Sequence, residues 1–359
     1  MIVESIQLDH FRNYEKLELN LDPGTNVFYG NNAQGKTNIL ESVYLCGTTR
    51  SHRMAKDREM IRFGEEEAHL RMKFRKRDVP YRIDMHLKRS HSKGIAINGV
   101  PIRKAGELIG LGYFVFFSPE DLNIIKNGPA DRRRFMDMLL CQQSASYIQN
   151  LSSYQKVLMQ RNRLLKEIPF HPDLADTLDT WDEQMIRYGS AVIFDRQQFI
   201  EKLAGTAETI HASLTGGKET LRILYEKNTS VDAFAMQLRE NRNRDLKMKM
   251  SMTGPHRDDL SFRNETIDLR RYGSQGQQRT TALSLKLAEI ELIRQNSHDT
   301  PVLLLDDVLS ELDRERQRLL LERISNIQTL ITCTDVGDFT ENQFQIDKMY
   351  HVKEGRIIQ

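Results

Sequence analysis

Cysteine is scarce in this chain, and its few copies are not paired. Cys46, Cys141 and Cys333 are the only three in 359 residues, and none belongs to a C-x-x-C motif. Such wide spacing argues against a structural zinc site and against a disulfide framework. We therefore expect a protein of a reducing compartment, the cytoplasm.

Long hydrophobic runs are also missing. The longest apolar stretch, residues 109–117, is too short to span a bilayer, and the first residues lack the hydrophobic core of a signal peptide. No heptad pattern continues over several repeats, which argues against a long coiled coil. We expect a soluble protein that is not exported.

Neither positive nor negative side chains are in large excess. The chain has 52 Lys and Arg residues against 50 Asp and Glu residues. Any affinity for nucleic acid must therefore come from local patches. The ten histidines are scattered along the chain, and His86 and His91 are expected to face solvent rather than to bind a ligand.

The most informative segment that is present is GNNAQGKT at residues 30–37, which fits the phosphate-loop pattern G-x-x-x-x-G-K-S/T without a mismatch. An alternating stretch at residues 25–29 predicts a strand before it, and apolar residues at helical spacing follow it. Backbone N–H groups of such a loop surround phosphates. The expected nucleotide contacts are Gly30, Asn31, Asn32, Ala33, Gln34, Gly35, Lys36 and Thr37. The alternative is a Gly-rich turn that matches by chance.

A pair of carboxylates supplies the second half of a nucleotide site. The apolar run at residues 302–305 predicts a buried strand that ends in Asp306 and Asp307. We expect Asp306, together with the Thr37 hydroxyl, to hold Mg²⁺, and Asp307 to orient the attacking water. The expected catalytic residues are Lys36, Asp306 and Asp307. The alternative is an acidic strand end that caps the next helix.

A third segment, rich in Ser, Gly and Gln, precedes a predicted helix. Ser274, Gly276 and Gln277 resemble the signature motif of ABC-type ATPases, in which a Ser hydroxyl and helix N-terminal amides bind a γ-phosphate. Taken alone, these would be ordinary turn residues. Residues 310–313 resemble the loop that this class places across a dimer interface, and Thr334 stands where many ABC proteins have a switch histidine.

The remaining chain shows two further patterns. Residues 70–75 and 81–88 alternate between apolar and polar side chains and predict a small antiparallel layer. Its polar face carries positive charge, which suits either water or phosphates. Apolar residues between positions 119 and 250 recur at helical spacing, which predicts a mainly helical insertion.

Together, several motifs resemble the RecF family of bacterial recombination mediators. They are FRNY at 11–14, the phosphate loop, FSPEDL at 117–122, RRRF at 132–135, GPHRDD at 254–259 and SQGQQR at 274–279. The resemblance spans nearly the whole chain. It implies an α/β head of the ABC-type P-loop class, a mixed sheet with an antiparallel β layer, at residues 1–120 and 251–359. It also implies a mainly helical arm at residues 121–250, and Arg12 in the first motif is counted among the expected nucleotide contacts.

For function, the resemblance implies ATP-dependent homodimerisation on DNA, the partners RecR and RecO, and roles in gap repair, replication restart and the SOS response. Candidate DNA contacts are basic residues on the antiparallel layer and at both ends of the arm. They are Arg71, Lys73, Arg75, Arg132, Arg133, Arg134, Arg239, Arg242, Arg244, Lys247 and Lys249.

Two departures from the wider ABC pattern favour slow hydrolysis. Asp307 replaces the usual Glu and so has a shorter reach, and Thr334 lacks an imidazole. A weak, DNA-stimulated ATPase is expected. A nonhydrolytic nucleotide-binding adaptor and a small-molecule phosphotransferase remain as alternatives, whereas a GTPase would need an N-K-x-D segment that the chain lacks.

Overall fold

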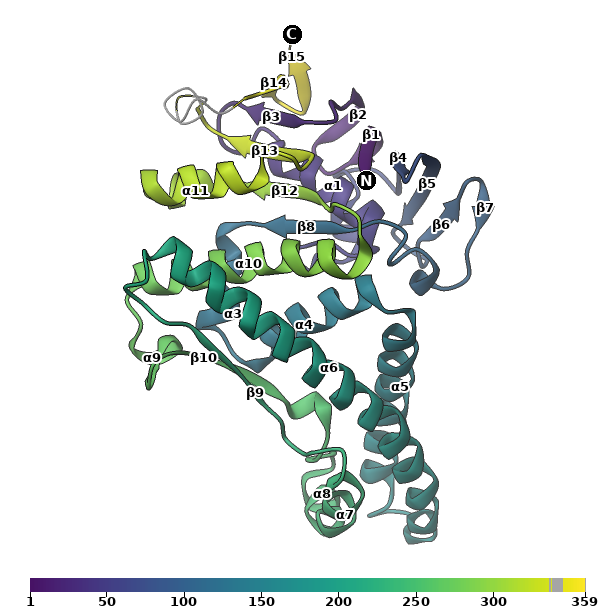
Figure 1. Ribbon diagram of the computed structural model, residues 1–359. Coiled ribbons are helices and arrows are strands. Elements are labelled where there is room, and N and C mark those ends of the chain that lie inside the picture. Colours follow the sequence, from purple (N-terminus) through teal and green to yellow (C-terminus); the bar gives the residue numbers. More distant parts are fainter. Residues whose placement is uncertain (336, 338–344, 359) are drawn as a thin grey trace. The chain divides into compact units, whose positions relative to one another are not determined.

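The computed structural model describes residues 1–335, 337 and 345–358, and the chain divides into two compact units (Figure 1). The first unit comprises Met1–Asp121 and Ile293–Gln359, and the second comprises Leu122–Leu292. The first boundary, after Asp121, lies one residue from the expected end of the first head segment. The second boundary, before Ile293, lies about forty residues beyond residue 251, where the head was expected to resume, so that expectation needs correction.

The first unit contains two six-stranded sheets, as expected for an α/β head with an antiparallel layer. One is antiparallel in the order β2-β1-β4-β5-β6-β7, and the other, in the order β15-β14-β3-β13-β12-β8, is parallel except for β15. The antiparallel strands are β1 (Ile2–Phe11), β2 (Tyr14–Asn20), β4 (Glu67–Lys76), β5 (Val79–Lys88), β6 (Gly94–Ile97) and β7 (Val100–Pro101). The others are β3 (Thr25–Tyr29), β8 (Phe114–Phe117), β12 (Val302–Asp306), β13 (Thr329–Cys333), β14 (Lys348–Lys353) and β15 (Arg356–Ile358).

Burial explains why these segments form these two kinds of sheet. Residues of β4 alternate between exposed and buried, so one face meets water and the other meets the core. Every residue of β12 and β13 is buried, as in a parallel sheet that is covered on both faces. The predicted antiparallel layer and the predicted buried strand are both confirmed.

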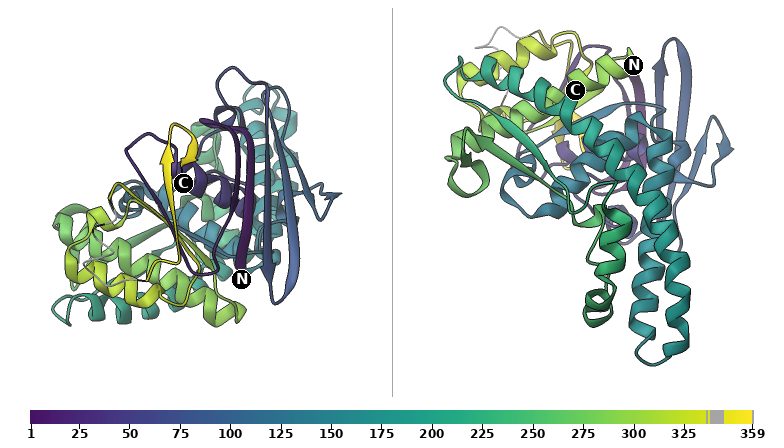
Figure 2. Two further views of the ribbon diagram at one scale, coloured as in Figure 1. Left: turned by 90° about the horizontal axis from the view of Figure 1, so that it is seen from above. Right: turned by 60° about the horizontal axis from the view of Figure 1, so that its bottom comes forward.

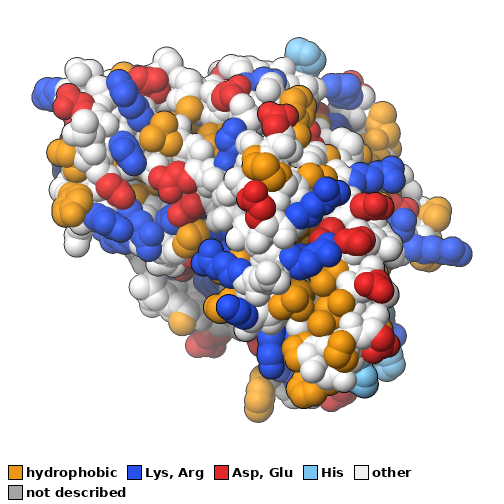
Figure 3. All heavy atoms as spheres, turned by 90° about the horizontal axis from the view of Figure 1, so that it is seen from below, with side chains coloured by type: hydrophobic (Ala, Val, Ile, Leu, Met, Phe, Trp, Pro, Cys, Tyr) orange, Lys and Arg blue, Asp and Glu red, His pale blue; other side chains and the backbone are white. Residues whose placement is uncertain are grey.

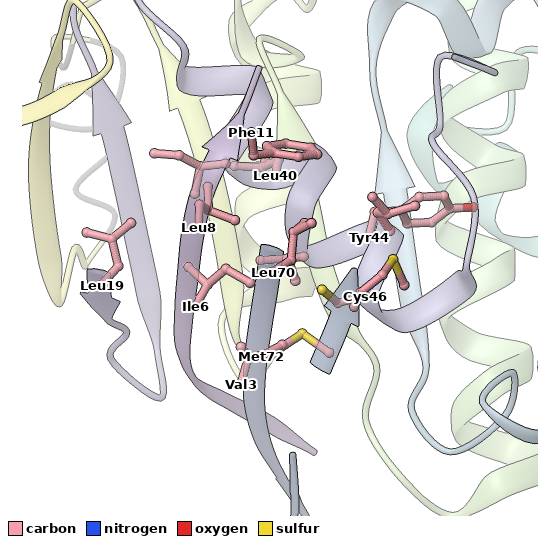
Figure 4. Close-up of a cluster of buried hydrophobic side chains, with 14 of the residues drawn as sticks. Val3, Ile6, Leu8, Phe11, Leu19, Leu40, Tyr44, Cys46, Leu70 and Met72 are labelled. Atoms are coloured by element: carbon pink, nitrogen blue, oxygen red, sulfur yellow. The ribbon is translucent and has the colours of Figure 1, made fainter. Parts of the chain in front are cut away.

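Helix α1 (Lys36–Thr48) contacts strands of both sheets, and one hydrophobic core joins all three. Figure 2 shows the ribbons of these elements from two further sides. In Figure 4, apolar side chains of β1 and β4, such as Ile6 and Leu70, lie beside those of α1, such as Leu40 and Cys46. The first unit also contains α2 (Asp57–Met60) and α11 (Arg314–Ile324). The core therefore fixes α1, and with it the loop that precedes α1, against both sheets.

The second unit is mainly helical, as expected, but it also holds a small sheet. Its helices are α3 (Leu122–Lys126), α4 (Pro129–Gln143), α5 (Ala145–Glu167), α6 (Leu178–Leu214), α7 (Phe234–Glu240), α8 (Arg242–Met248), α9 (Leu269–Tyr272) and most of α10 (Gln275–Ser297). Its antiparallel strands, β9 (Arg222–Glu226), β10 (Asp259–Asn264) and β11 (Ile267–Asp268), were not expected. None of the described helices is both long enough and apolar enough to cross a membrane.

The GPHRDD segment explains why residues beyond 251 belong with the arm. The Arg196 guanidinium on α6 contacts Asp258 at 3.1 Å and Asp137 of α4 at 2.8 Å, and the Arg196 side chain is only 2% exposed. Arg132 of α4 forms a two-pronged ion pair with Asp259, at 2.6 and 2.9 Å. Strand β10 also pairs with β9. Buried ion pairs and a strand ladder thus hold this segment in the second unit.

The same ion pair corrects the expectation for Arg132. Its side chain is 1% exposed, and its remaining donor reaches the backbone oxygen of Asn127 at 2.7 Å. A buried, fully paired guanidinium is not available to a DNA phosphate. The Arg132 side chain therefore has a structural role in the arm.

Replacing Arg196 with Leu should destabilise the second unit by about 3–5 kcal/mol, because Asp137 and Asp258 would lose their buried counter-charge. Urea unfolding followed by the fluorescence of Trp181, the sole tryptophan, which lies on α6, would measure the effect.

The matched control is Arg163→Leu, which removes an exposed ion pair with Glu167. We expect it to cost less than about 0.5 kcal/mol. Equal losses in the two variants would contradict a special contribution from the buried pairs.

Candidate nucleotide site

The phosphate loop connects β3 to α1 and needs its two glycines. Gly30 and Gly35 have φ angles of 137° and 112°, a region that side chains rarely adopt. A Cβ on Gly30 would lie 2.5 Å from the Val352 oxygen, and one on Gly35 would lie 2.6 Å from Asn13 Nδ2. Helix α1 begins directly after Gly35, so its first backbone N–H groups lie beside the loop.

Residues of the FRNY segment hold the loop in place, a role that the sequence did not reveal. Asn13 donates from Nδ2 to the Gln34 oxygen at 2.9 Å, and the Tyr14 hydroxyl donates to the Gly35 oxygen at 3.0 Å. From the other sheet, the Gly355 amide donates to the same Gln34 oxygen at 3.1 Å. Burial raises the pKa of Tyr14 well above its ordinary value, so the hydroxyl stays a proton donor. The loop is thus fastened to both sheets.

Lys36 lies at the start of α1 with its side chain buried. Its ammonium donates to the backbone oxygens of Gly30 and Asn31, the latter at 2.9 Å. Burial lowers the pKa of Lys36, and the nearby Asp307 and Asp306 carboxylates oppose that shift. These contacts place the charge of Lys36 inside the curve of the loop.

Thr37 and Asp306 meet although 269 residues separate them in the chain. The Thr37 hydroxyl donates to Asp306 Oδ1 at 2.7 Å, and the Thr332 hydroxyl donates to the same oxygen at 2.7 Å. Burial raises the pKa of Asp306, while these two hydrogen bonds oppose the rise. A hydroxyl beside a carboxylate offers the oxygen donors that Mg²⁺ prefers, so these residues fit that ion.

Asp307 directly follows β12, and its backbone is not in the extended conformation of the strand. It has a positive φ of 53°, a conformation that Asp tolerates better than most residues. Its amide donates to the Thr332 hydroxyl at 3.0 Å, so Thr332 contacts both acidic residues. Sequence reasoning missed Thr332, whose only signal was a polar residue inside an apolar strand.

Arg12 makes contacts that the sequence did not suggest. Its guanidinium forms two hydrogen bonds of 2.8 Å with Glu41, a fully buried carboxylate on α1, and a third of 2.8 Å with the Glu59 oxygen. Despite burial, hydrogen bonds from Arg12 and Ser51 lower the pKa of Glu41. The structure thus shows Arg12 as a brace on α1, and its contact with nucleotide stays a prediction.

Ser274 belongs to the second unit, unlike Lys36. Its hydroxyl accepts from the Gln277 amide at 3.2 Å, and the Gln277 side chain accepts from the Ser274 amide at 3.0 Å. This reciprocal arrangement caps α10. Ser274 and Gly276 are both exposed, so the capped helix start is open to an external ligand.

Most of the remaining basic candidates carry an acidic or backbone partner. Arg71 contacts Asp84 at 2.5 Å, Arg75 contacts Glu4 at 3.1 Å, and Arg134 contacts Asp131. Arg133 donates to the backbone oxygen of Asp258 at 2.6 Å. On the face shown in Figure 3, Lys and Arg side chains lie among Asp and Glu side chains. The exposed Lys73 has no ion-pair partner among the described residues.

Among the candidates near residue 250, Arg242 on α8 also has acidic partners. Arg242 contacts Asp179 at 2.5 Å and Asp182 at 2.6 Å. The helices α7 and α8 carry the remaining candidates Arg239, Arg244 and Lys247, and Lys249 follows α8. Thr334 is exposed immediately after β13, where the sequence placed it.

Comparisons with known proteins identify the family of the chain. The family model described as RecF/RecN/SMC N terminal domain matches residues 2–357. The chain is 56% identical, over 99% of each chain, to the DNA replication and repair protein RecF of Agathobacter rectalis. It is 54% identical to the RecF of Lachnospira eligens, over 100% of this chain and 99% of that relative.

Solved structures extend the similarity to three dimensions. One described as "Structure of the recombination mediator protein RecF-ATP in RecFOR pathway" has a TM-score of 0.93 and 34% identity, covering 99% of this chain and 97% of that chain. The Smc head domain of Pyrococcus furiosus has a TM-score of 0.59 at 15% identity, covering 99% and 96%, and supports the fold alone. The chain therefore belongs to the RecF family.

Proposed function

We propose that this protein is an ATP-dependent DNA-binding repair protein that dimerises around ATP and hydrolyses it slowly. The observation that carries the proposal is the hydrogen bond between Thr37 and Asp306 beside a complete phosphate loop. It joins the two halves of an NTPase site from opposite ends of the sequence. The solved relative described as RecF-ATP supports ATP as the nucleotide.

In this proposal, Lys36 exchanges its bonds with the Gly30 and Asn31 oxygens for bonds with the β- and γ-phosphates. The N-terminal amides of α1 bind the same phosphates. Mg²⁺ bound near Thr37 and Asp306 would neutralise phosphate charge. Release of the loop carbonyls by Lys36 thus accompanies nucleotide binding.

Asp307 is the proposed acceptor for the attacking water. Its backbone is fixed by Thr332, whereas its side chain is only partly buried and follows Asp306 directly. A carboxylate one methylene shorter than Glu positions water less closely, which fits slow turnover. Slow turnover would give the ATP-bound state a long lifetime.

The exposed helix start at Ser274 would bind the γ-phosphate of ATP on a second copy of the chain. Because ADP lacks that phosphate, ATP would favour the dimer more strongly than ADP. ATP binding would then control dimerisation, and hydrolysis would reverse it. The proposed partners are DNA at gaps or junctions, RecR and RecO, and the proposed location is the cytoplasm.

Replacing Asp307 with Asn should leave Mg·ATP binding within about threefold of the parent while slowing turnover at least about tenfold, because the amide is a poorer proton acceptor. Asp306→Asn should instead weaken Mg·ATP binding itself. ATP titrations and steady-state phosphate release measure both. Parental turnover in the Asp307 variant would remove this residue from the water-orienting role. A parent that binds Mg·ATP but releases no phosphate would favour the adaptor alternative.

The decisive test of the composite site mixes two inactive chains. Lys36→Ala should lose ATP binding, and Ser274→Arg should lose the ATP-induced dimer while still binding ATP, which checks its folding. A heterodimer of the two retains one intact site, formed by Lys36 of one chain and Ser274 of the other. Partial ATP turnover, up to about half of the parent per heterodimer, should return.

Light scattering and differently tagged chains would establish that heterodimers form. Heterodimers that remain inactive at every mixing ratio would show that each site is complete within one chain. The matched control is a mixture of two differently tagged Lys36→Ala chains, which should stay inactive.

DNA binding should depend strongly on salt and weakly on sequence, because the candidate contacts are Lys and Arg side chains that reach phosphates. Lys73→Ala should reduce the slope of log affinity against log salt by roughly one. Lys202→Ala, an exposed lysine on α6, is the control. An unchanged slope in the Lys73 variant would exclude this lysine from the DNA contact.

A further inference from the structure

Three residues on the polar face of the antiparallel sheet form a cluster that the nucleotide site does not use. Strand register aligns Asp9 of β1 with His69 of β4, His69 with His86 of β5, and His86 with Gly94 of β6. Glu67 lies two residues before His69 and therefore projects from the same face of β4. The register thus gathers two imidazoles and a carboxylate that are scattered in the sequence.

The side chains of this cluster already approach one another. His86 Nε2 lies 2.8 Å from Glu67 Oε2, and His69 Nε2 lies 3.6 Å from Glu67 Oε1. The two imidazole rings are stacked with centroids 4.0 Å apart and planes inclined by 24°. One ligand atom from each of the three residues lies within 4.8 Å of the others. Both Nε2 atoms therefore face the same carboxylate.

The charge of Glu67 suits a cation at this place. Two imidazole nitrogens and one carboxylate oxygen form a donor set that zinc sites use.

Room for further ligands exists beside the two rings. His69 and His86 line an open hollow of about 480 Å³, whose wall also includes Asp9 and Arg71. Gly94 of β6 lies next to His86 across the strands and has no side chain, so it leaves space beside the ring. The nearest atom to a Cβ built on Gly94 would be the His86 Cβ, at 4.0 Å. Water could thus complete a tetrahedral coordination sphere, as it does where zinc has three protein ligands.

We propose that Glu67, His69 and His86 form a divalent transition-metal site on the outer face of the antiparallel sheet, with Zn²⁺ as its ion. Imidazole nitrogens favour Zn²⁺ over Mg²⁺, which prefers oxygen ligands. Zinc bonds of about 2.0–2.2 Å would draw the three side chains closer together. All three side chains are between 31% and 52% exposed, so the surrounding core does not prevent that adjustment.

This site is distinct from the proposed Mg²⁺ position at Thr37 and Asp306, whose donors are all oxygens. Bound Zn²⁺ would add positive charge to the polar face that also carries Arg71 and Lys73, because residues 67, 69, 71 and 73 alternate onto one side of β4. The proposal does not depend on the proposed function, since metal binding can be measured without ATP or DNA.

The test is a competition titration of the full chain with Zn²⁺ and a chromophoric chelator, in excess Mg²⁺ so that oxygen-only sites are filled. We expect one Zn²⁺ per chain. In the variant His69→Asn, His86→Asn, that binding should weaken at least about tenfold. The matched control is His91→Asn, His171→Asn, which changes two exposed histidines elsewhere and should bind Zn²⁺ as the parent does.

Two further measurements guard against a misfolded variant and a nonspecific ion. ATP binding should be unchanged in both double variants. With Co²⁺ in place of Zn²⁺, the visible absorption of a four-coordinate ion should appear in the parent and disappear in His69→Asn, His86→Asn. Absence of stoichiometric Zn²⁺ binding in the parent, or equal losses in the two double variants, would overturn the proposal.

Discussion

The parallel pairing of β3, β13 and β12 is the constraint on which the nucleotide site depends. Neighbouring parallel strands end at the same edge of a sheet, so the residues that follow them must meet there. The register places Thr332 beside Asp306, and β13 also pairs with β3, which leads into the phosphate loop. Segments from opposite ends of the chain thus meet around Thr37. A shift of one residue in this register would move Asp306 away from the Thr37 hydroxyl.

The antiparallel sheet contributes to the same site through one short segment. Asn13 and Tyr14 hold the phosphate loop by its backbone oxygens, and the neighbouring Arg12 pairs with Glu41 of α1. The loop needs such support because its glycines make it conformationally free when it is unconstrained. The FRNY segment therefore connects the second sheet to the chemistry, although none of its described contacts involves Asp306 or Asp307.

A different interaction organises the second unit. Arg132, Arg161 and Arg196 are almost completely buried, and each is paired with one or two aspartates from other segments of the chain. Burying a charge is costly unless an opposite charge lies beside it, so each pair permits few alternative arrangements of the helices. These pairs account for Arg132 in the RRRF motif and for Asp258 and Asp259 in the GPHRDD motif. Their residues shape the arm, and a motif that is specific to a family need not contact its ligand.

The elements that could be predicted from the amino-acid sequence are those whose signals are local. Residue spacing predicts the alternating strands at 70–75 and 81–88, the apolar strand before Asp306 and the helical character of the arm, because burial on one face or on both imposes that spacing. The phosphate loop is predicted by its motif, whose residues are those that phosphate binding requires. The RecF resemblance, carried by motifs, extended these elements to a family, and the comparisons confirmed it.

Which distant residues share a site could be seen only in the folded chain, because hydrogen bonds between remote segments leave no periodic pattern in the sequence. In the structure, Thr332 forms a hydrogen bond with Asp306, and the Arg132 side chain is buried in an ion pair. Residues beyond 251 belong to the arm because β10 pairs with β9. Sequence reasoning set the histidines aside as scattered. Cross-strand register placed His69 beside His86, since contact across a sheet depends on which strands pair and not on separation along the chain.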